Sequence, residues 1–387
     1  MARFLNSIYA RVWLAANKAS IPAYQGQLQQ ILEAKEDRPV VIFPPGLGWV
    51  IQLFQRPQQL ALALARQGAL VFYLEPVHPS SSRGFHQKAD NFYLCHMPLE
   101  TFRILEEPYV HVMTWNARAA GKFNGPRVIY DYVDDLDAFE GSRERLESDH
   151  QQMLKNAYLV LATARRLFQA IQLARPDALL VPNGVDYNHF SPLKLEGILP
   201  VPADLDPVLA IRKPLVGYHG ALARWFDYEL FEQVALKRQD LTFLLIGPDI
   251  DGSLRDSDLL KVQNIHWLGV KSYQELPEYV SHFDAAVIPF KLNEITHSTS
   301  PIKLYEYLAA GKPVVMTPMQ ESVQLNVALH AREVEEFCRQ LDQALLLKTD
   351  QKYINRLKQI ALSNTWDARA RQILQALQGQ PHTVLKS

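Results

Sequence analysis

A lysine and a glutamate three positions apart, Lys303 and Glu306, lie near the start of a helix predicted over 300–310. Ser300 is a typical N-cap residue, and Pro301 suits the first turn. The free N–H groups and the dipole of a helix start favour an anion, so a lysine is unexpected there. The pattern indicates a local anion site, although a solvated Lys–Glu pair would leave the same sequence.

Four aspartates crowd the end of a strand predicted over 127–131, namely Asp131, Asp134, Asp135 and Asp137. Like charges so close raise one another's pKa, and a raised carboxyl pKa suits a general base. We therefore expect Asp131 or Asp134 to be a catalytic base. Asp135 or Asp137 would equally serve as a helix cap.

A glycine-containing loop, PPGLGW, follows the first predicted strand and supplies Gly46, Gly48 and Trp49. We predict that this loop, together with Arg56, crosses the predicted cleft and touches a ligand there, either acceptor or donor. A dinucleotide-binding turn is excluded, because the third glycine is missing and Pro57 delays the helix start by about a dozen residues.

A second loop, GYHGALARW, begins the second half of the alternating pattern. Gly220 permits a close backbone approach, and Arg224 is placed to reach a phosphate. His219, between two glycines, either lines this site or fills space.

The composition is that of an ordinary folded protein, with 387 residues, 48% apolar residues and a net charge of −1. No global field therefore attracts nucleic acid, and any anion site must be local. Cys95 and Cys338 lie far apart and have no zinc spacing, which favours a reducing cytosol.

No run reaches the roughly 18 apolar residues of a membrane span. Residues 1–20 have adjacent apolar stripes and three basic residues, as in an interfacial membrane helix. A helix docked on its own domain would show the same pattern.

The strands that must position the candidate site residues alternate with helices along the chain. This alternation predicts two open, mostly parallel α/β domains that face a central cleft. Strands are expected over 39–43, 69–76, 109–115, 127–131, 157–163, 178–186, 214–220, 241–249, 264–269 and 284–290 and from 314 onward, and helices over 56–68, 141–157, 164–174, 228–238, 273–283 and 300–310. The predicted divisions are a helical preamble (1–35), a first Rossmann-like domain (36–195), a proline-rich linker (196–213), a second Rossmann-like domain (214–365) and a C-terminal helix with its tail (366–387).

Four stretches resemble a nucleotide-sugar glycosyltransferase of the GT-B fold, most of all glycosyltransferase family 4 and its teichuronic-acid and exopolysaccharide-type relatives. They are RPQQLALALARQG, VIYDYVDDLDAFEG, LLVPNGVDYNHF, and the series GYHGALARWFDYELF, FLLIGPD, NIHWLG and SPIKLYEYLAAGKPVV. The resemblance covers about residues 40–365. It implies that the C-terminal helix crosses back to the first domain, which binds the acceptor.

The resemblance also implies a donor site in the second domain, with Lys303 at the diphosphate and Glu306 at the ribose hydroxyls. The implied donor-binding residues are Gly220, Arg224, Gly247, Pro248, Val270, Ser298, Thr299, Ser300, Pro301, Lys303 and Glu306. The chain departs from the family at Ser298, where a second glutamate is usual. Ser298, Thr299, Asn293 and Thr296 are then candidates for the sugar hydroxyls, and the stereochemical outcome stays open.

The expected activity is transfer of a sugar, of hexosyl type, from a UDP- or GDP-linked donor to a hydroxyl of a glycan, a lipid-linked or a small-molecule acceptor. No metal, other cofactor or nucleic acid is expected. A cytoplasmic location is expected, with peripheral membrane contact through residues 1–20 as an alternative. Two other functions stay open: a catalytically silent nucleotide-binding scaffold, which the missing glutamate favours, and a sugar-nucleotide epimerase of the same fold.

Overall fold

The computed structural model describes residues 20–76, 82–139, 141–191 and 200–379, and it divides the chain into two compact units. The first unit contains residues up to 51, 55–182 and the chain from 367 onward, and the second contains 52–54 and 183–366. Of the linker predicted over 196–213, the part from 200 onward belongs to the second unit, and 196–199 lie outside the described residues.

Among the described residues, the first unit has an eight-stranded sheet of order β3-β4-β2-β1-β5-β6-β7-β8. Only the pairing of β3 with β4 is antiparallel. The strands are β1 (Val40–Phe43), β2 (Leu70–Leu74), β3 (Gly84–Ala89), β4 (Phe92–His96), β5 (Tyr109–Met113), β6 (Arg127–Tyr132), β7 (Leu159–Ala162) and β8 (Leu179–Leu180). Strand β2 is buried along its whole length, as expected of an apolar run in a parallel sheet covered on both faces.

Helices lie around this sheet, and the one that matters most for the site is α3. It begins after Gln55, whose backbone N–H donates to the side chain of Gln58 (3.1 Å), and Pro57 fits its first turn. The helices and 3₁₀ turns of the unit are α2 (Ile21–Glu33), α3 (Arg56–Arg66), η2 (Leu99–Ile104), η3 (Thr114–Lys122), η4 (Leu136–Ala138), α4 (Arg143–Asn156) and α5 (Arg165–Ile171).

The second unit has a parallel sheet of order β11-β10-β9-β12-β13-β14 in the described chain. The strands are β9 (Leu215–His219), β10 (Thr242–Ile246), β11 (Ile265–Trp267), β12 (Ala285–Ile288), β13 (Val314–Met316) and β14 (Leu329–His330). This is the strand order of a doubly wound dinucleotide-binding fold. Its switch point, at which the strand order reverses, lies between β9 and β12. Ligands of such sheets bind at the carboxyl ends of the strands beside this switch point.

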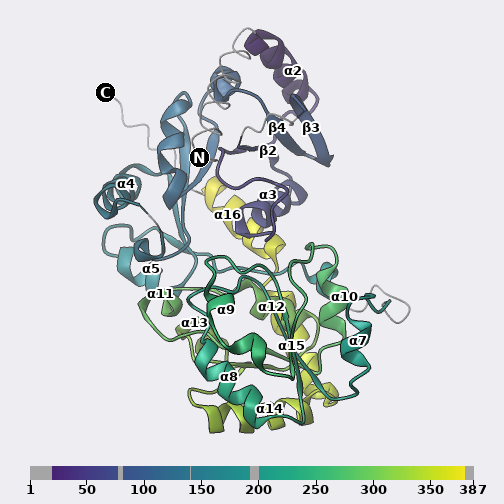
Figure 1. Ribbon diagram of the computed structural model, residues 1–387. Helices are drawn as coiled ribbons and strands as arrows, with labels where there is room; N and C mark the ends of the chain where they lie inside the picture. The colour runs from purple at the N-terminus through teal and green to yellow at the C-terminus, as the bar shows by residue number, and fades with distance from the viewer. Residues whose placement is uncertain (1–19, 77–81, 140, 192–199, 380–387) are drawn as a thin grey trace. The chain divides into compact units, whose positions relative to one another are not determined.

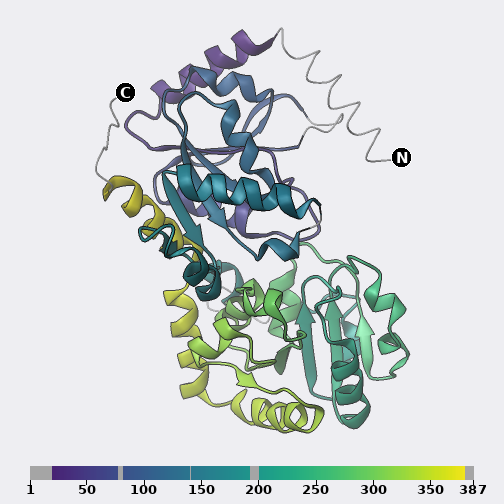
Figure 2. The ribbon, with the colours of Figure 1, turned by 90° about the vertical axis from the view of Figure 1, so that its left-hand side faces the viewer.

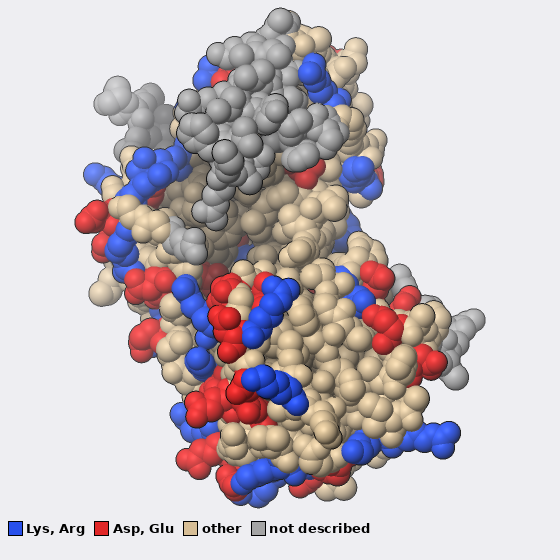
Figure 3. All heavy atoms as spheres, viewed as in Figure 1, with Lys and Arg blue, Asp and Glu red and all other residues tan. Residues whose placement is uncertain are grey.

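Helices cover both faces of the second sheet (Figure 2). Helix α8 packs on α14, and α12 packs on α15. The helices are α6 (Tyr187–Phe190), α7 (Asp206–Leu209), α8 (Tyr228–Lys237), α9 (Ser253–Asp256), η6 (Leu259–Lys261), α10 (Leu276–Ser281), α11 (Glu294–His297), α12 (Ile302–Ala309), α13 (Gln320–Leu325), α14 (Val334–Leu347) and α15 (Gln351–Ser363). Charges of both signs are interspersed over this unit in Figure 3.

The last helix, α16 (Trp366–Gly379), belongs with the first unit from Asp367 onward and runs beside α3 (Figure 1). Asp367 forms an ion pair with Arg66 (2.7 Å), and Gln372 donates to the carbonyl of Leu180 (3.1 Å). The predicted return of the C-terminal helix to the first domain is confirmed.

The structure differs from the sequence predictions in a few elements. The β3–β4 hairpin and β14 were not predicted, and the strand expected over 178–186 is the two-residue β8. None of the described helices combines the length and the apolarity that a membrane crossing needs. Residues 1–19, which make up nearly all of the predicted interfacial helix, lie outside the described residues.

Candidate functional site

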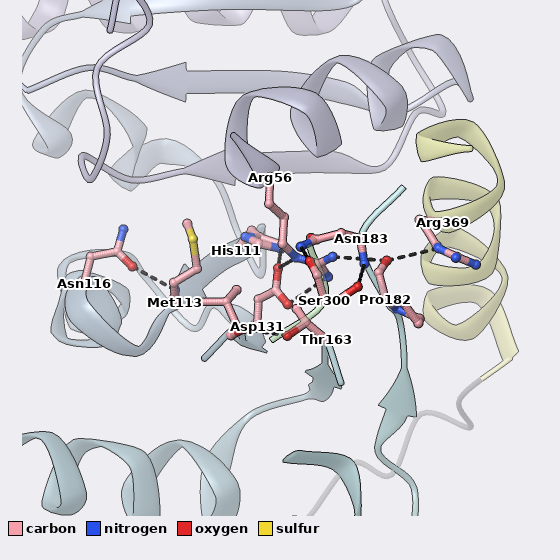
Figure 4. A network of polar contacts seen from close by, with 11 residues as sticks. Arg56, His111, Met113, Asn116, Asp131, Thr163, Pro182, Asn183, Ser300 and Arg369 are labelled. Carbon is pink, nitrogen blue, oxygen red and sulfur yellow. Dashed lines mark hydrogen bonds and ion pairs between the residues drawn. The ribbon is translucent and has the colours of Figure 1, made fainter. Parts of the chain in front are cut away.

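The start of α12 carries the residues predicted to meet a phosphate. The helix begins at Ile302 after Pro301, which is the N-cap and provides no side-chain hydrogen bond. The prediction that Ser300 caps the helix is therefore wrong by one residue. Instead, the Ser300 hydroxyl accepts from the backbone N–H of Asn183 (3.3 Å), and its carbonyl accepts from the Asn183 amide (2.6 Å; Figure 4). The first turn is thus left without a side-chain acceptor for its N–H groups.

Lys303, in this first turn, points its amino group over two aromatic rings. The Nζ atom lies 5.3 Å from the ring centre of Tyr218 and 4.8 Å from that of Phe290. Burial lowers the pKa of Lys303 to about 8, although Glu306 acts in the opposite direction. Among the described residues, no group forms a hydrogen bond or an ion pair with the Lys303 amino group. This amino group can therefore bind an anionic ligand.

Glu306 lies one turn further along α12 and is only 5% exposed. Burial raises the pKa of its carboxyl to about 8, with Lys303 acting to lower it. Its Oε2 atom lies 3.4 Å from Nε2 of His219, the last residue of β9. Burial, and then Lys303, lower the pKa of His219 to about 3, so this imidazole is neutral near pH 7.

Two predicted glycines bring the loops after β9 and β10 into backbone contact. Gly220 and Gly247 have φ angles of +128° and +137°, which glycine adopts without strain. A Cβ atom on Gly247 would lie 2.0 Å from the carbonyl oxygen of Gly220. The backbone N–H of Gly220 donates to Ile246 (2.9 Å), and the carbonyl of Pro248 accepts from Leu222 (2.9 Å). The two loops are therefore locked together at the carboxyl edge of the sheet.

Arg224 and Val270 lie on the outer parts of the same edge. The Arg224 side chain is exposed, and only its backbone N–H is fixed, by a hydrogen bond to Asp251 (2.9 Å). Val270 is 41% exposed, three residues after β11 ends. Both residues are therefore accessible to solvent, and their contact with a donor stays a prediction.

The hydroxyl-bearing residues before α12 have local partners. Ser298 is fully buried, and its hydroxyl donates to the carbonyl of Glu294 (2.9 Å). Thr299 donates to Ile295 (2.9 Å). These two hydrogen bonds complete the C-terminal end of the short helix α11. The Ser298 hydroxyl is therefore used within the helix, which corrects the predicted contact with a sugar. Asn293 and Thr296 likewise cap the start of α11 through each other.

In the first unit, Asp131 is a buried partner of Arg56 (Figure 4). The guanidinium binds both carboxylate oxygens (2.7 and 2.9 Å), and His111 lies 3.2 Å away. Burial alone would raise the pKa of Asp131, but Arg56 and His111 lower it to about 2. A fully buried carboxylate of such low basicity is unsuited to be a general base, which corrects the prediction for Asp131.

The same pair corrects the prediction for Arg56, which was expected to contact a ligand. The side chain is 5% exposed and also donates to the carbonyl of Pro182 (3.4 Å). Arg369 of α16 donates to that carbonyl as well (3.0 Å). Arg56 therefore fixes the start of α3 to the ends of β6 and β8.

Asp134 has the properties expected of a base. It is half-buried just after β6, and burial raises the pKa of its carboxyl to about 7. Arg56 lowers this pKa, while Asp135 and Asp131 raise it further. Burial, rather than the crowding of charges, is the main cause. Asp135 caps η4 by accepting from the N–H of Asp137 (3.0 Å), as one of the alternatives predicted.

The loop after β1 is held by a carboxylate that the sequence analysis did not assign to the site. Glu75, after β2, accepts from the N–H of Trp49 (2.5 Å) and contacts His96. The Trp49 ring packs against Tyr73 and Phe92. Burial would raise the pKa of Glu75, but its bonds to His96 and Trp49 lower it.

The two glycines of this loop lie against different neighbours. A Cβ atom on Gly46 would lie 3.0 Å from the Asn116 amide nitrogen, whereas one on Gly48 would meet Ile51 at 3.5 Å. Gly46 therefore permits a close approach to η3, and Gly48 is in ordinary contact.

The comparisons agree with this geometry. Residues 213–346, which include β9 to β14, match the family described as glycosyl transferases group 1. The whole sheet of the second unit therefore lies in the segment that resembles this family. The predicted glycosyltransferase activity and GT-B fold are confirmed.

Relatives of this glycosyltransferase extend over both units. It is 28% identical over 280 residues to TuaH of Bacillus subtilis (strain 168), named for teichuronic acid biosynthesis, with 67% of this chain and 69% of TuaH covered. The structure of Anabaena HepE in complex with UDP-glucose matches with a TM-score of 0.64 and 14% identity, covering 88% of this chain and 100% of HepE. Sucrose-phosphate synthase from Thermosynechococcus elongatus matches with a TM-score of 0.59 and 15% identity, covering 88% of this chain and 98% of that one.

Proposed function

We propose that this glycosyltransferase transfers a hexosyl group from a nucleoside diphosphate sugar to an acceptor hydroxyl. The observation that carries the proposal is Lys303, an amino group held over two aromatic rings at the start of α12, with Glu306 one turn behind it. A diphosphate supplies the anion that this lysine and the free N–H groups of the helix lack. The HepE structures in complex with UDP and with UDP-glucose support this choice of donor class.

The proposed reaction is driven by stabilisation of the leaving group. The bond between the anomeric carbon of the sugar and the diphosphate oxygen breaks, and a bond from the acceptor oxygen to that carbon forms. Lys303, Arg224 and the start of α12 would stabilise the charge that develops on the departing diphosphate. No metal or other cofactor is required in this scheme, because these groups supply the positive charge.

The proton of the acceptor hydroxyl has two destinations, which correspond to the two stereochemical outcomes. In an inverting reaction, the Asp134 carboxylate would accept it, as its pKa of about 7 allows near neutral pH. In a retaining reaction, the departing diphosphate would accept it. The first unit, which carries Asp134, Gly46, Gly48 and Trp49, is proposed to bind the acceptor.

The proposed acceptor is the hydroxyl of a glycan, a lipid-linked or a small-molecule acceptor, and the first of these is supported by the likeness to TuaH. The cytoplasm is proposed as the location, because the described cysteines, Cys95 and Cys338, are free thiols. Peripheral membrane contact through residues 1–20 is tested by deleting them: loss of sedimentation with anionic vesicles would support it, and unchanged sedimentation would contradict it.

The donor site is tested by a thermal-shift panel of UDP, GDP, ADP and dTDP with their sugars. A ligand that binds only the folded state raises the melting temperature by mass action. We expect Lys303→Ala to bind the diphosphate at least tenfold more weakly, which corresponds to a loss of about 1.4 kcal/mol of binding free energy. The matched control is Lys352→Ala, because Lys352 is also the second residue of its helix and is exposed.

Equal affinities in the parent, Lys303→Ala and Lys352→Ala would contradict the donor site. Release of nucleoside diphosphate in the presence of an acceptor distinguishes a transferase from a silent scaffold, which would bind without turnover. Release without any acceptor, accompanied by an epimerised sugar, would instead identify an epimerase.

A further inference from the structure

We propose that His219 is a positioning residue that orients the Glu306 carboxylate, so that the enzyme selects a ribonucleoside over a 2′-deoxyribonucleoside donor. The inference rests on the proposed function, because it concerns the ribose end of the same donor site. It adds a residue that the sequence left ambiguous between lining the site and filling space.

The imidazole of His219 is held rigidly from several sides. The residue is 3% exposed at the carboxyl end of β9, and its backbone N–H donates to the hydroxyl of Tyr307 (2.8 Å). The Tyr307 ring meets the imidazole edge to face, with centroids 4.8 Å apart. The Phe190 ring lies nearly parallel to it at 6.1 Å. The imidazole is therefore packed against aromatic rings on two sides.

This orientation aims the Nε2 atom at Glu306. Nε2 lies 3.4 Å from Oε2 of the carboxyl, and among the described residues it is buried without a hydrogen-bond partner. Hydrogen bonds of a binding site are often long without ligand and tighten when it binds. A small movement of the glutamate would therefore complete this bond.

The chemistry explains what such a bond would do. A carboxylate offers about four acceptor positions on its two oxygens. A neutral imidazole that donates from Nε2 would use one of them and leave the others for ribose hydroxyls. It would also favour the ionised carboxylate, the form that accepts from both hydroxyls, against the effect of burial.

A donor without its 2′-hydroxyl would leave a buried carboxylate oxygen without a partner. Sites built around such a hydrogen bond discriminate strongly against an analogue that lacks the group, because the unpaired polar atom has lost its water. Packing alone by His219 would give no such discrimination, since it would affect both nucleotides equally.

The test compares binding of a nucleoside diphosphate with binding of its 2′-deoxy analogue by calorimetry, using the base that binds best in the thermal-shift panel. We expect the parent enzyme to prefer the ribonucleotide by at least tenfold. His219→Phe keeps a ring between Tyr307 and Phe190 but has no donor, and the preference should fall below about threefold. His219→Gln restores an N–H donor and should recover much of the preference.

A preference in His219→Phe that stays within twofold of the parent value would overturn the inference, as would a parent enzyme with no preference. If His219→Phe fails to fold, His219→Asn supplies the same comparison, because its shorter side chain withdraws the donor from Glu306. A parent that binds neither nucleotide would instead contradict the proposed function itself.

Discussion

The side chain of Lys303 occupies the space that a side chain at Gly220 would need. A Cβ atom built on Gly220 would lie 2.6 Å from Cε of the lysine and 3.1 Å from its Nζ. A side chain at position 220 would therefore require the end of the Lys303 side chain to move. This contact links the glycine of one predicted motif to the lysine of another.

Gly220→Ala should consequently displace Lys303 and weaken diphosphate binding by at least tenfold. Some loss of stability is expected as well, because an alanine at a φ of +128° costs about 1–3 kcal/mol. Gly141→Ala is the matched control: Gly141 has the same φ of +128°, but a Cβ atom there would meet nothing within 4 Å. Thermal shift with and without UDP measures both effects. Equal loss of binding in the two variants would show that backbone strain, rather than contact with Lys303, is responsible.

The sequence predicted most of the strands and several of the helices, although not the long helices α14 and α15. Runs such as VVIF and TFLLI are buried on both sides of parallel sheets, and Pro57 and Gly68 bracket α3 as expected. The β3–β4 hairpin was missed because its first strand, GFHQKA, is largely polar and partly exposed. The predicted start of α12 was one residue too early, because Ser300 was expected to be the N-cap, whereas Pro301 occupies that position.

The roles of individual site residues depended on partners that are distant in the sequence. Arg56 and Asp131 are 75 positions apart, so no local pattern showed that they neutralise each other. The four aspartates therefore looked alike, although the structure makes Asp131 a strong acid and Asp134 a weak one. The rings around Lys303 likewise come from β9 and from the segment after β12, which only the folded sheet brings together.

Removal of Arg56 should destabilise the first unit severely. Arg56→Met leaves the fully buried Asp131 carboxylate without its main counter-charge, and breaking such a pair costs about 3–5 kcal/mol. The double variant Arg56→Met/Asp131→Asn removes both charges and should recover a large part of this loss. Urea unfolding of the parent, both single variants and the double variant measures the coupling. Additive effects of the two substitutions would contradict a direct pair.

The same pair should make stability depend on pH at the acid end. The pKa of Asp131 is about 2 in the folded protein, below its usual value near 3.9. Its contribution is therefore complete above about pH 4 and is lost as the pH falls towards 2. Asp131→Asn should flatten that part of the stability curve. A curve of unchanged slope between pH 4 and 2 would mean that other carboxyl groups control acid unfolding.

The Glu306 carboxyl should give the stability of the protein the opposite dependence on pH. Burial raises the pKa of its carboxyl to about 8, so between its usual value of 4.5 and 8 the folded state holds a proton that the unfolded state has lost. This contribution is complete below about pH 4.5 and is lost as the pH rises through 8. Glu306→Gln should consequently gain stability relative to the parent between pH 5 and 8. Glu229→Gln, at an exposed position, is the control, and the same trend there would exclude Glu306 as the cause.

Substitution of Asp134 should distinguish an inverting reaction from a retaining one. If the reaction inverts, the rate should rise as the pH passes through about 7, because only the ionised carboxylate accepts the proton of the acceptor hydroxyl. Asp134→Asn should then lower kcat by a factor of about 10² to 10⁴ and remove this inflection. Asp137→Asn is the control, since Asp137 belongs to the same cluster but is exposed and paired with Arg143. Release of nucleoside diphosphate measures the rate. A kcat within a few-fold of the parent in Asp134→Asn would instead indicate that the departing diphosphate takes the proton, as in a retaining enzyme.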